Sequence, residues 1–177
     1  MTIPNTPNAN DNGKYTKKTA LIHLRSLKLD ELRHRYKNAP EYGLCTPNYN
    51  DTTTNGLTRC LLDFLRLNGC QAERISNEGR IRDNRKTITD VMGHTKTIGS
   101  IQRIKSSGQL GTADISATIQ GRSVKIEVKN ENTKERQRQA QIEYQRQVEA
   151  AGGIYCIATS FSQFLNWFYA TIEKIQL

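Results

Sequence analysis

The chain has 177 residues, of which 36% are hydrophobic, so it can supply one modest core with an additional segment. Its formal net charge is +9, from 26 basic and 17 acidic side chains, and this excess favours a polyanionic partner such as nucleic acid. No apolar stretch is long enough to span a membrane and the first residues lack a signal-peptide pattern, so we expect a cytoplasmic protein. The four cysteines have no metal-ligand spacing, which predicts neither a zinc site nor a structural disulfide.

Three segments are expected along the chain. Residues 1–16 are rich in Asn, Thr and Pro and carry few bulky apolar groups, so we predict a flexible tail. In residues 17–50, leucines recur at helical spacing among Arg and Lys, which predicts a basic helical extension with one or two short amphipathic helices. That leucine stripe either packs on the rest of the protein or binds a partner. Residues 51–177 are expected to form the main domain.

Helix and strand patterns alternate along the main domain. A Thr-rich N-cap precedes an expected helix at residues 55–68, and a strand is expected at residues 71–75. After a basic, loop-rich stretch, residues 98–105 are expected to form another strand. Asn132 is the expected N-cap of a helix that runs to Ala151, where Gly152 ends it. A strand at 154–158 and a helix capped by Ser160 complete the chain.

The basic stretch carries seven basic and two acidic residues between positions 80 and 105. Such a segment gains affinity for the phosphates of nucleic acid without reading sequence. We therefore expect DNA-backbone contacts from Arg80, Arg82, Arg85, Lys86, Lys96, Arg103 and Lys105. The alternative is a solvated basic face that serves solubility.

Residues 111–129 have the pattern of a β-hairpin. Apolar and polar residues alternate strictly on both sides of Gln120-Gly121, a pair suited to a two-residue turn. This turn would place one apolar face toward the core and would set Asp114 directly opposite Glu127 on the other face. A one-residue slip would separate the two carboxylates, but it would also turn the apolar side chains to the wrong face.

Opposed carboxylates on neighbouring strands repel each other, so we expect a cation between them. Two carboxylates, with the remaining positions left to water and phosphate, suit Mg²⁺. Lys129 lies on the same face as Glu127, one alternation further along the strand. The alternative is that Asp114, Glu127 and Lys129 are ordinary charges on the solvent face of a half-buried hairpin.

The hairpin and the segments after it resemble the PD-(D/E)XK nuclease superfamily, and more narrowly the VRR-NUC and Holliday-junction-resolvase-like endonucleases. The matching features lie between about residues 105 and 168. They are Gly111-Thr112-Ala113-Asp114, Glu127-Val128-Lys129, Gln141 on the following helix, Gly152-Gly153 and the strand at 154–158. The resemblance implies an α/β fold with a restriction-endonuclease-like core, in which helices flank a mixed central sheet. The helical N-terminal extension predicted from the leucine spacing precedes this core.

The resemblance also implies a metal-dependent DNA endonuclease. Asp114, Glu127 and the Val128 backbone carbonyl would hold Mg²⁺ or Mn²⁺, and Lys129 and Gln141 would complete the catalytic set. Nucleases that cut two strands commonly pair two sites, so the resemblance is compatible with a homodimer. The alternative for Gln141 is a structural role, in which its side-chain amide forms hydrogen bonds with nearby backbone groups.

Two departures from the family pattern support a second interpretation. The helix at 55–68 offers only Asp63 as an upstream acid, on the side away from its apolar stripe, and Arg138 stands where the family usually has Ser. A catalytically degenerate DNA-binding or junction-recognition module is therefore the alternative function. The sequence leaves open the DNA topology, the sequence preference and the biological pathway.

Overall fold

Four strands form one mixed sheet in the order β1, β6, β7, β8. The computed structural model describes residues 14–75, 79–105, 108–132 and 136–175. β1 (Gln71–Arg74) pairs antiparallel with β6 (Ile115–Ile119), and β6 pairs antiparallel with β7 (Arg122–Val128). β7 pairs in parallel with β8 (Ile154–Ala158), so the protein has a mixed α/β fold.

The hairpin of β6 and β7 has the predicted register. Gln120 and Gly121 both have positive φ, 48° and 79°, as a two-residue turn of the type favoured in hairpins requires. Ile119 pairs with Arg122, and the ladder continues until Ile115 faces Ile126. The apolar residues of both strands therefore share one face, and that face is buried.

Helices α2 (Thr54–Leu67) and α4 (Phe161–Ile175) cover this apolar face. Phe64 of α2 lies at the centre of the core, with its ring centroid 4.9 Å from that of Phe168 and 5.8 Å from that of Phe161. All three rings are buried, and edge-to-face pairs of this kind add to the burial energy. α1 (Lys17–Arg35) packs on α2 and α4 and adds Ala20 and Leu24 to the same core, and the short 3₁₀ helix η1 (Glu41–Gly43) follows it.

The chain just before α1 is tied down, which corrects the predicted tail at residues 14–16. Tyr15 is buried and stacks on Tyr169 with ring centroids 5.7 Å apart. Its backbone N–H donates to Asn166 Oδ1 at 2.8 Å, and the Asn166 amide donates back to the Tyr15 carbonyl at 3.2 Å. Thr16 caps α1, which is one helix of 19 residues. The rest of the predicted tail, residues 1–13, lies outside the described residues.

α3 (Gln139–Ala150) packs against β8 and lies over the sheet face opposite the core. The sequence places the start of this helix at Asn132, and that prediction is wrong. The Asn132 side chain donates to the Thr52 carbonyl at 3.0 Å instead, and its N–H donates to Asn130 Oδ1 at 2.9 Å. Residues 130–132 are therefore anchored to the loop before α2 and do not enter a helix.

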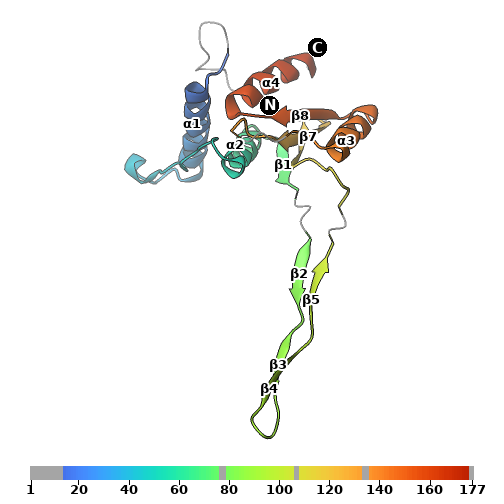
Figure 1. Ribbon diagram of the computed structural model, residues 1–177. Coiled ribbons are helices and arrows are strands. Elements are labelled where there is room, and N and C mark those ends of the chain that lie inside the picture. Colours follow the sequence, from blue (N-terminus) through green and yellow to red (C-terminus); the bar gives the residue numbers. More distant parts are fainter. Residues whose placement is uncertain (1–13, 76–78, 106–107, 133–135, 176–177) are drawn as a thin grey trace.

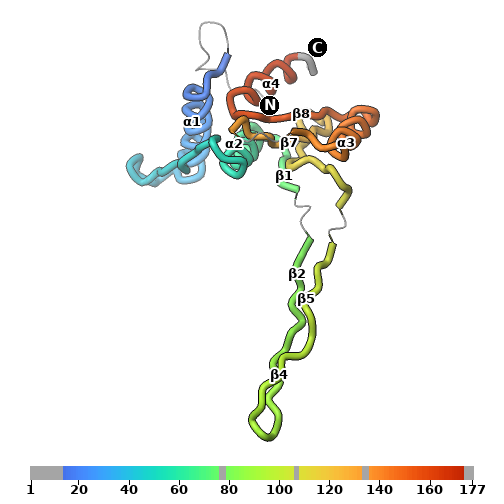
Figure 2. Tube along the Cα trace, in the orientation of Figure 1, coloured from blue at the N-terminus to red at the C-terminus, as the bar shows by residue number. Residues whose placement is uncertain are grey.

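Residues 79–105 form a long two-stranded arm that extends away from the rest of the protein (Figures 1 and 2). Its lower ribbon pairs β2 (Arg80–Asp83) with β5 (Ile101–Ile104), and its outer ribbon pairs β3 (Lys86–Thr89) with β4 (Thr95–Ile98). The sequence pattern predicts only one strand here, at residues 98–105. Both faces of the arm are exposed, so the usual apolar and polar alternation does not mark its strands.

None of the helices in the described parts of the chain is both long and apolar enough to cross a lipid bilayer.

Candidate active site

The polar face of the sheet lies beneath α3 and carries the charged side chains of β7. Lys125 donates from Nζ to Ser116 Oγ across the β6–β7 ladder at 2.6 Å, as the predicted pairing requires. Tyr144 of α3 contacts Tyr155 of β8 edge-on, with ring centroids 6.4 Å apart. A helix therefore covers a charged sheet face, which lowers its exposure to water.

Asp114 lies one position beyond the last ladder pair of β6 and β7, opposite Glu127. Its carbonyl accepts a hydrogen bond from the Ile75 N–H at 2.8 Å, which ties this position to the end of β1. Its carboxylate Oδ2 accepts from the Val128 N–H at 2.9 Å. Both neighbouring strands thus fix the Asp114 carboxylate beside Glu127.

Glu127 is a buried carboxylate, with only 2% of its surface exposed. Its Oε1 accepts hydrogen bonds from the Gln141 side-chain amide and from Lys129 Nζ, the latter at 3.1 Å. Its Oε2 has no hydrogen-bond partner among the described residues. Burial raises the pKa of Glu127, and the negative charge of Asp114 raises it further, against the opposing effects of Lys129 and Gln141.

Lys129 and Gln141 both contact Glu127 through the same oxygen, Oε1. The Lys129 side chain is 13% exposed, and its backbone N–H donates to the Ala158 carbonyl at 3.0 Å. Gln141 uses its Oε1 to accept the Arg138 N–H at 2.8 Å at the start of α3, and its amide nitrogen to donate to Glu127. The predicted backbone contact of Gln141 is therefore present, and the same side chain also reaches Glu127, whereas its catalytic role stays a prediction.

Gly111 sets the distance between α3 and the start of β6. It has φ +80°, and a Cβ at this position would lie 2.1 Å from the Ala140 carbonyl oxygen in the first turn of α3. A side chain cannot occupy that space, so only glycine allows this close approach. Because Gly111 allows α3 to lie this close to the start of β6, Gln141 in the first turn of α3 can reach Glu127.

The two carboxylates fit a small divalent cation. The unpartnered Oε2 of buried Glu127 and the neighbouring Asp114 carboxylate are hard oxygen ligands, and Mg²⁺ commonly uses only one or two such protein groups. No cluster of three or more His, Cys, Asp or Glu side chains suited to a metal occurs among the described residues. The Val128 carbonyl stays a prediction as a third ligand.

Asp63, the upstream acid named in the sequence analysis, makes its contacts away from this pair, and so does Asp51, which precedes α2. Asp63 accepts a hydrogen bond from the Tyr49 hydroxyl at 3.0 Å and lies 4.0 Å from Arg59, on α2. Asp51 accepts the Phe161 N–H at 3.1 Å and so binds at the start of α4. The Asp63 carboxylate therefore interacts with residues on and before α2, and the Asp51 carboxylate binds a backbone N–H at the start of α4.

Tyr155 is a site residue that the sequence pattern did not reveal. It pairs with Lys125 in the parallel β7–β8 ladder, on the face that carries Glu127. Burial raises the pKa of its hydroxyl, and the negative charge of Glu127 adds to that rise. The pairing of β7 with β8 fixes this position, and a parallel register between distant segments leaves no local sequence signal.

The predicted DNA-binding residues lie on the arm, apart from the carboxylate pair. At the foot of the arm, Arg103 and Lys105 line an open groove of about 690 Å³ that continues to Gln109, Leu110 and Gly111. This groove leads from the arm to the segment just before Asp114. Arg80 also lies at the foot, opposite Ile104, and Arg82 lies opposite Gln102. Arg85, Lys86 and Lys96 lie further out along the arm.

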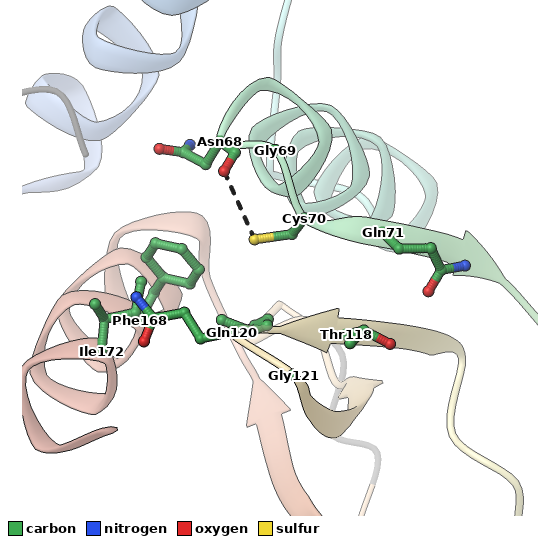
Figure 3. Close-up of a pocket in the computed structure, with 10 residues that line it drawn as sticks. Asn68, Gly69, Cys70, Gln71, Thr118, Gln120, Gly121, Phe168 and Ile172 are labelled. Carbon is green, nitrogen blue, oxygen red and sulfur yellow. Dashed lines mark hydrogen bonds between the residues drawn. The ribbon is translucent and has the colours of Figure 1, made fainter. Parts of the chain in front are cut away.

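A second cavity, of about 520 Å³, lies at the opposite end of the β6–β7 hairpin (Figure 3). It is lined by the turn residue Gln120, by Asn68 to Cys70 just after α2, and by Phe168 and Ile172 of α4. The Cys70 thiol contacts the Asn68 carbonyl at 3.9 Å, and burial raises its pKa. A thiol with a raised pKa is a weak nucleophile at neutral pH, so this cavity has no evident catalytic group among the residues that line it.

A scan against models of known protein families gave no match for this chain, and a search of curated proteins gave none either.

Proposed function

We propose that this protein is a metal-dependent DNA endonuclease that hydrolyses phosphodiester bonds. One observation carries the proposal. The buried Glu127 keeps one carboxylate oxygen without a partner among the described residues, while Asp114 adds a second negative charge beside it. Such an arrangement is unfavourable for stability alone, and groups of this kind cluster at functional sites.

The arrangement of elements supports a restriction-endonuclease-like core as the finer fold. In the PD-(D/E)XK superfamily that the chain resembles, a strand that begins at a Gly-x-x-Asp sequence is followed by a Glu-x-Lys strand, a helix with Gln, and a further strand. β6, β7, α3 and β8 follow that order, and the parallel pairing of β7 with β8 leaves α3 as the crossover. Asp114, Glu127, Lys129 and Gln141 then meet at one edge of the sheet.

Asp114 and Glu127 would hold the divalent cation. Mg²⁺ or Mn²⁺, when bound, supplies Lewis-acid polarisation of a phosphate oxygen and lowers the pKa of a coordinated water. Lys129 Nζ, 3.1 Å from Glu127, is placed to orient the water and to stabilise negative charge that develops on the phosphate. Gln141 fixes the Glu127 carboxylate, and α3 limits access of bulk water to the site.

DNA is the proposed substrate because of the net charge of +9 and the basic groove that leads to Gly111. A homodimer stays part of the proposal, because cleavage of two strands would need two such sites.

A catalytically degenerate DNA-binding module is the second candidate. The observation that favours it is the two-carboxylate site without a third acid among the described residues. This candidate predicts DNA binding that weakens with salt and no metal-stimulated cleavage of any DNA topology.

The decisive experiment is a cleavage assay with supercoiled, single-stranded, flapped and four-way DNA. Each substrate is incubated with Mg²⁺ or Mn²⁺, and EDTA is the metal-free control. Glu127→Gln and Asp114→Asn are the test variants, and Glu143→Gln, an exposed acid on α3, is the matched control. We expect cleavage by the wild type and by Glu143→Gln only. Equal cleavage by all four proteins would exclude these carboxylates from the reaction.

A further inference from the structure

The arm is an interaction surface without a core of its own. Every residue of its four strands is exposed, and its five isoleucines keep 41 to 74% of their surface in water. A two-stranded ribbon is marginally stable in water when nothing packs on it. We therefore expect a binding partner to cover the exposed apolar surface of this arm.

The charge of the arm selects the kind of partner. Seven basic and two acidic residues between positions 80 and 105 give the arm a net charge of +5. Asp83 is paired with Arg85 at 2.8 Å, and Asp90 accepts the backbone N–H groups of Met92 and His94 at 2.9 and 2.8 Å. Both acids are thus engaged within the arm. A polyanion complements this surface, whereas a second copy of this basic chain would repel it.

The outer ribbon has two different faces, as the β3–β4 register shows. On one face, lysines and isoleucines alternate, with Lys86 opposite Ile98 and Ile88 opposite Lys96. The other face consists of four threonines, in the pairs Thr87–Thr97 and Thr89–Thr95. Lysines suit phosphates, and threonine hydroxyls and methyls suit base edges. The major groove of duplex DNA, about 12 Å wide, admits a ribbon of two strands.

The tip of the arm exposes two apolar side chains, between Asp90 and His94. Val91 and Met92 keep 103 and 78% of their surface in water, in the turn between β3 and β4. From Arg80 to Met92 the strand rise of about 3.3 Å per residue gives a reach of roughly 40 Å. At about 3.4 Å per base pair, this reach equals about 12 base pairs.

We propose that the arm runs parallel to the axis of the duplex DNA that flanks the cleavage position, with its outer ribbon at a groove, its lysines at phosphates and the apolar side chains of its tip against the bases about 12 base pairs away. This inference rests on the proposed function for the identity of the partner. The groove that joins Arg103 and Lys105 to Gly111 continues the path of that duplex toward Asp114. The substrate class is then DNA with a duplex flank of at least that length.

An arm-shortened variant tests the inference directly. Asp83 faces Ile101 across the β2–β5 ladder, so residues 84–100 can be replaced by Asn-Gly, which suits a two-residue turn. Binding to duplexes of about 8 and about 24 base pairs, one shorter and one longer than the reach of the arm, is measured by fluorescence anisotropy in EDTA. We expect the wild type to prefer the longer duplex, and the variant to bind it about tenfold more weakly and to lose that preference.

Two side-chain variants separate the roles of charge and tip in the intact arm. Lys86→Gln with Lys96→Gln should reduce the slope of log K against log salt by about 1.8 if each lysine contacts a phosphate. Val91→Ser with Met92→Ser should weaken binding and leave that slope unchanged. Lys18→Gln with Lys37→Gln removes the same charge from exposed positions outside the arm and is the matched control.

The outcomes distinguish this inference from the proposed function. The role of the arm would be overturned if the arm-shortened variant kept the DNA affinity of the wild type and the Lys86→Gln, Lys96→Gln variant kept its salt slope. This conclusion would hold even if the protein cleaves DNA. Loss of self-association in the shortened variant, with DNA binding intact, would overturn it in favour of a second copy as partner. Arm-dependent DNA binding without metal-dependent cleavage would support the inference and refute the nuclease.

Discussion

Replacement of Glu127 by Gln should stabilise the metal-free protein at neutral and alkaline pH. Burial and the charge of Asp114 raise the pKa of Glu127 in the folded protein above its ordinary value. As pH rises from about 4.5 through the raised pKa, the folded state holds the proton longer than the unfolded state. The stability of the wild type therefore falls over this range. The neutral amide of the Glu127→Gln variant would imitate the protonated carboxyl, so the variant would not show this loss.

The magnitude follows from the surroundings of the carboxylate. Oε2 is buried without a partner among the described residues, and an unsatisfied buried polar group costs about 1 to 3 kcal/mol, or more if charged. We expect Glu127→Gln to recover about 1 to 3 kcal/mol at pH 8. For a chain of this length, each kcal/mol shifts Tm by roughly 2 to 4 °C. At pH values below about 4.5, the two proteins should have similar stability.

The assay is thermal unfolding followed by circular dichroism, from about pH 4 to about pH 8.5, in EDTA and in about 10 mM Mg²⁺. Mg²⁺ should raise the Tm of the wild type because it binds only the folded site, and it should leave Glu127→Gln nearly unchanged. Glu143→Gln, an exposed acid on the same helix as Gln141, is the control for loss of one negative charge. A metal-free Glu127→Gln protein clearly less stable than the wild type at pH 8 would refute the reasoning.

Three further predictions concern the support of the site. Gly111→Ala should reduce cleavage at least tenfold while DNA affinity stays within about twofold, because a Cβ 2.1 Å from the Ala140 carbonyl displaces α3; unchanged kcat would contradict it. Lys129→Met should abolish cleavage and keep the Mg²⁺-dependent rise in Tm, whereas loss of that rise would assign the lysine to the integrity of the metal site. Phe64→Ala should cost about 3 to 5 kcal/mol in chemical denaturation, since the ring is buried among other aromatic rings; a loss below about 1 kcal/mol would contradict this packing.

The sequence predicts the β6–β7 hairpin well because two local signals agree there. Strict alternation fixes the two faces, and Gln120-Gly121 fixes the loop length, so the register follows without tertiary information. The same register places Asp114 opposite Glu127. Lys129 follows from alternation on the same strand.

Other parts depend on contacts between distant segments. α3 begins after Arg138, whose N–H donates to Gln141 Oε1, and not after a cap at Asn132, whose side chain binds the Thr52 carbonyl. Tyr155 reaches the site only because β8 pairs in parallel with β7. The strands of the arm lack a buried face, so the hydrophobic period that normally marks a strand is missing.

The arm also has a consequence for how this protein can change. It connects β1 to β6, which already pair side by side, with Arg74 facing Ile115. The whole arm is therefore an enlarged hairpin connection, and the cost of closing such a connection grows only slowly with its length. Residues can be added to or removed from the two ribbons in matched pairs without a change in the sheet or its helices. The span that the protein reaches is thus adjustable separately from the sheet that carries Asp114 and Glu127.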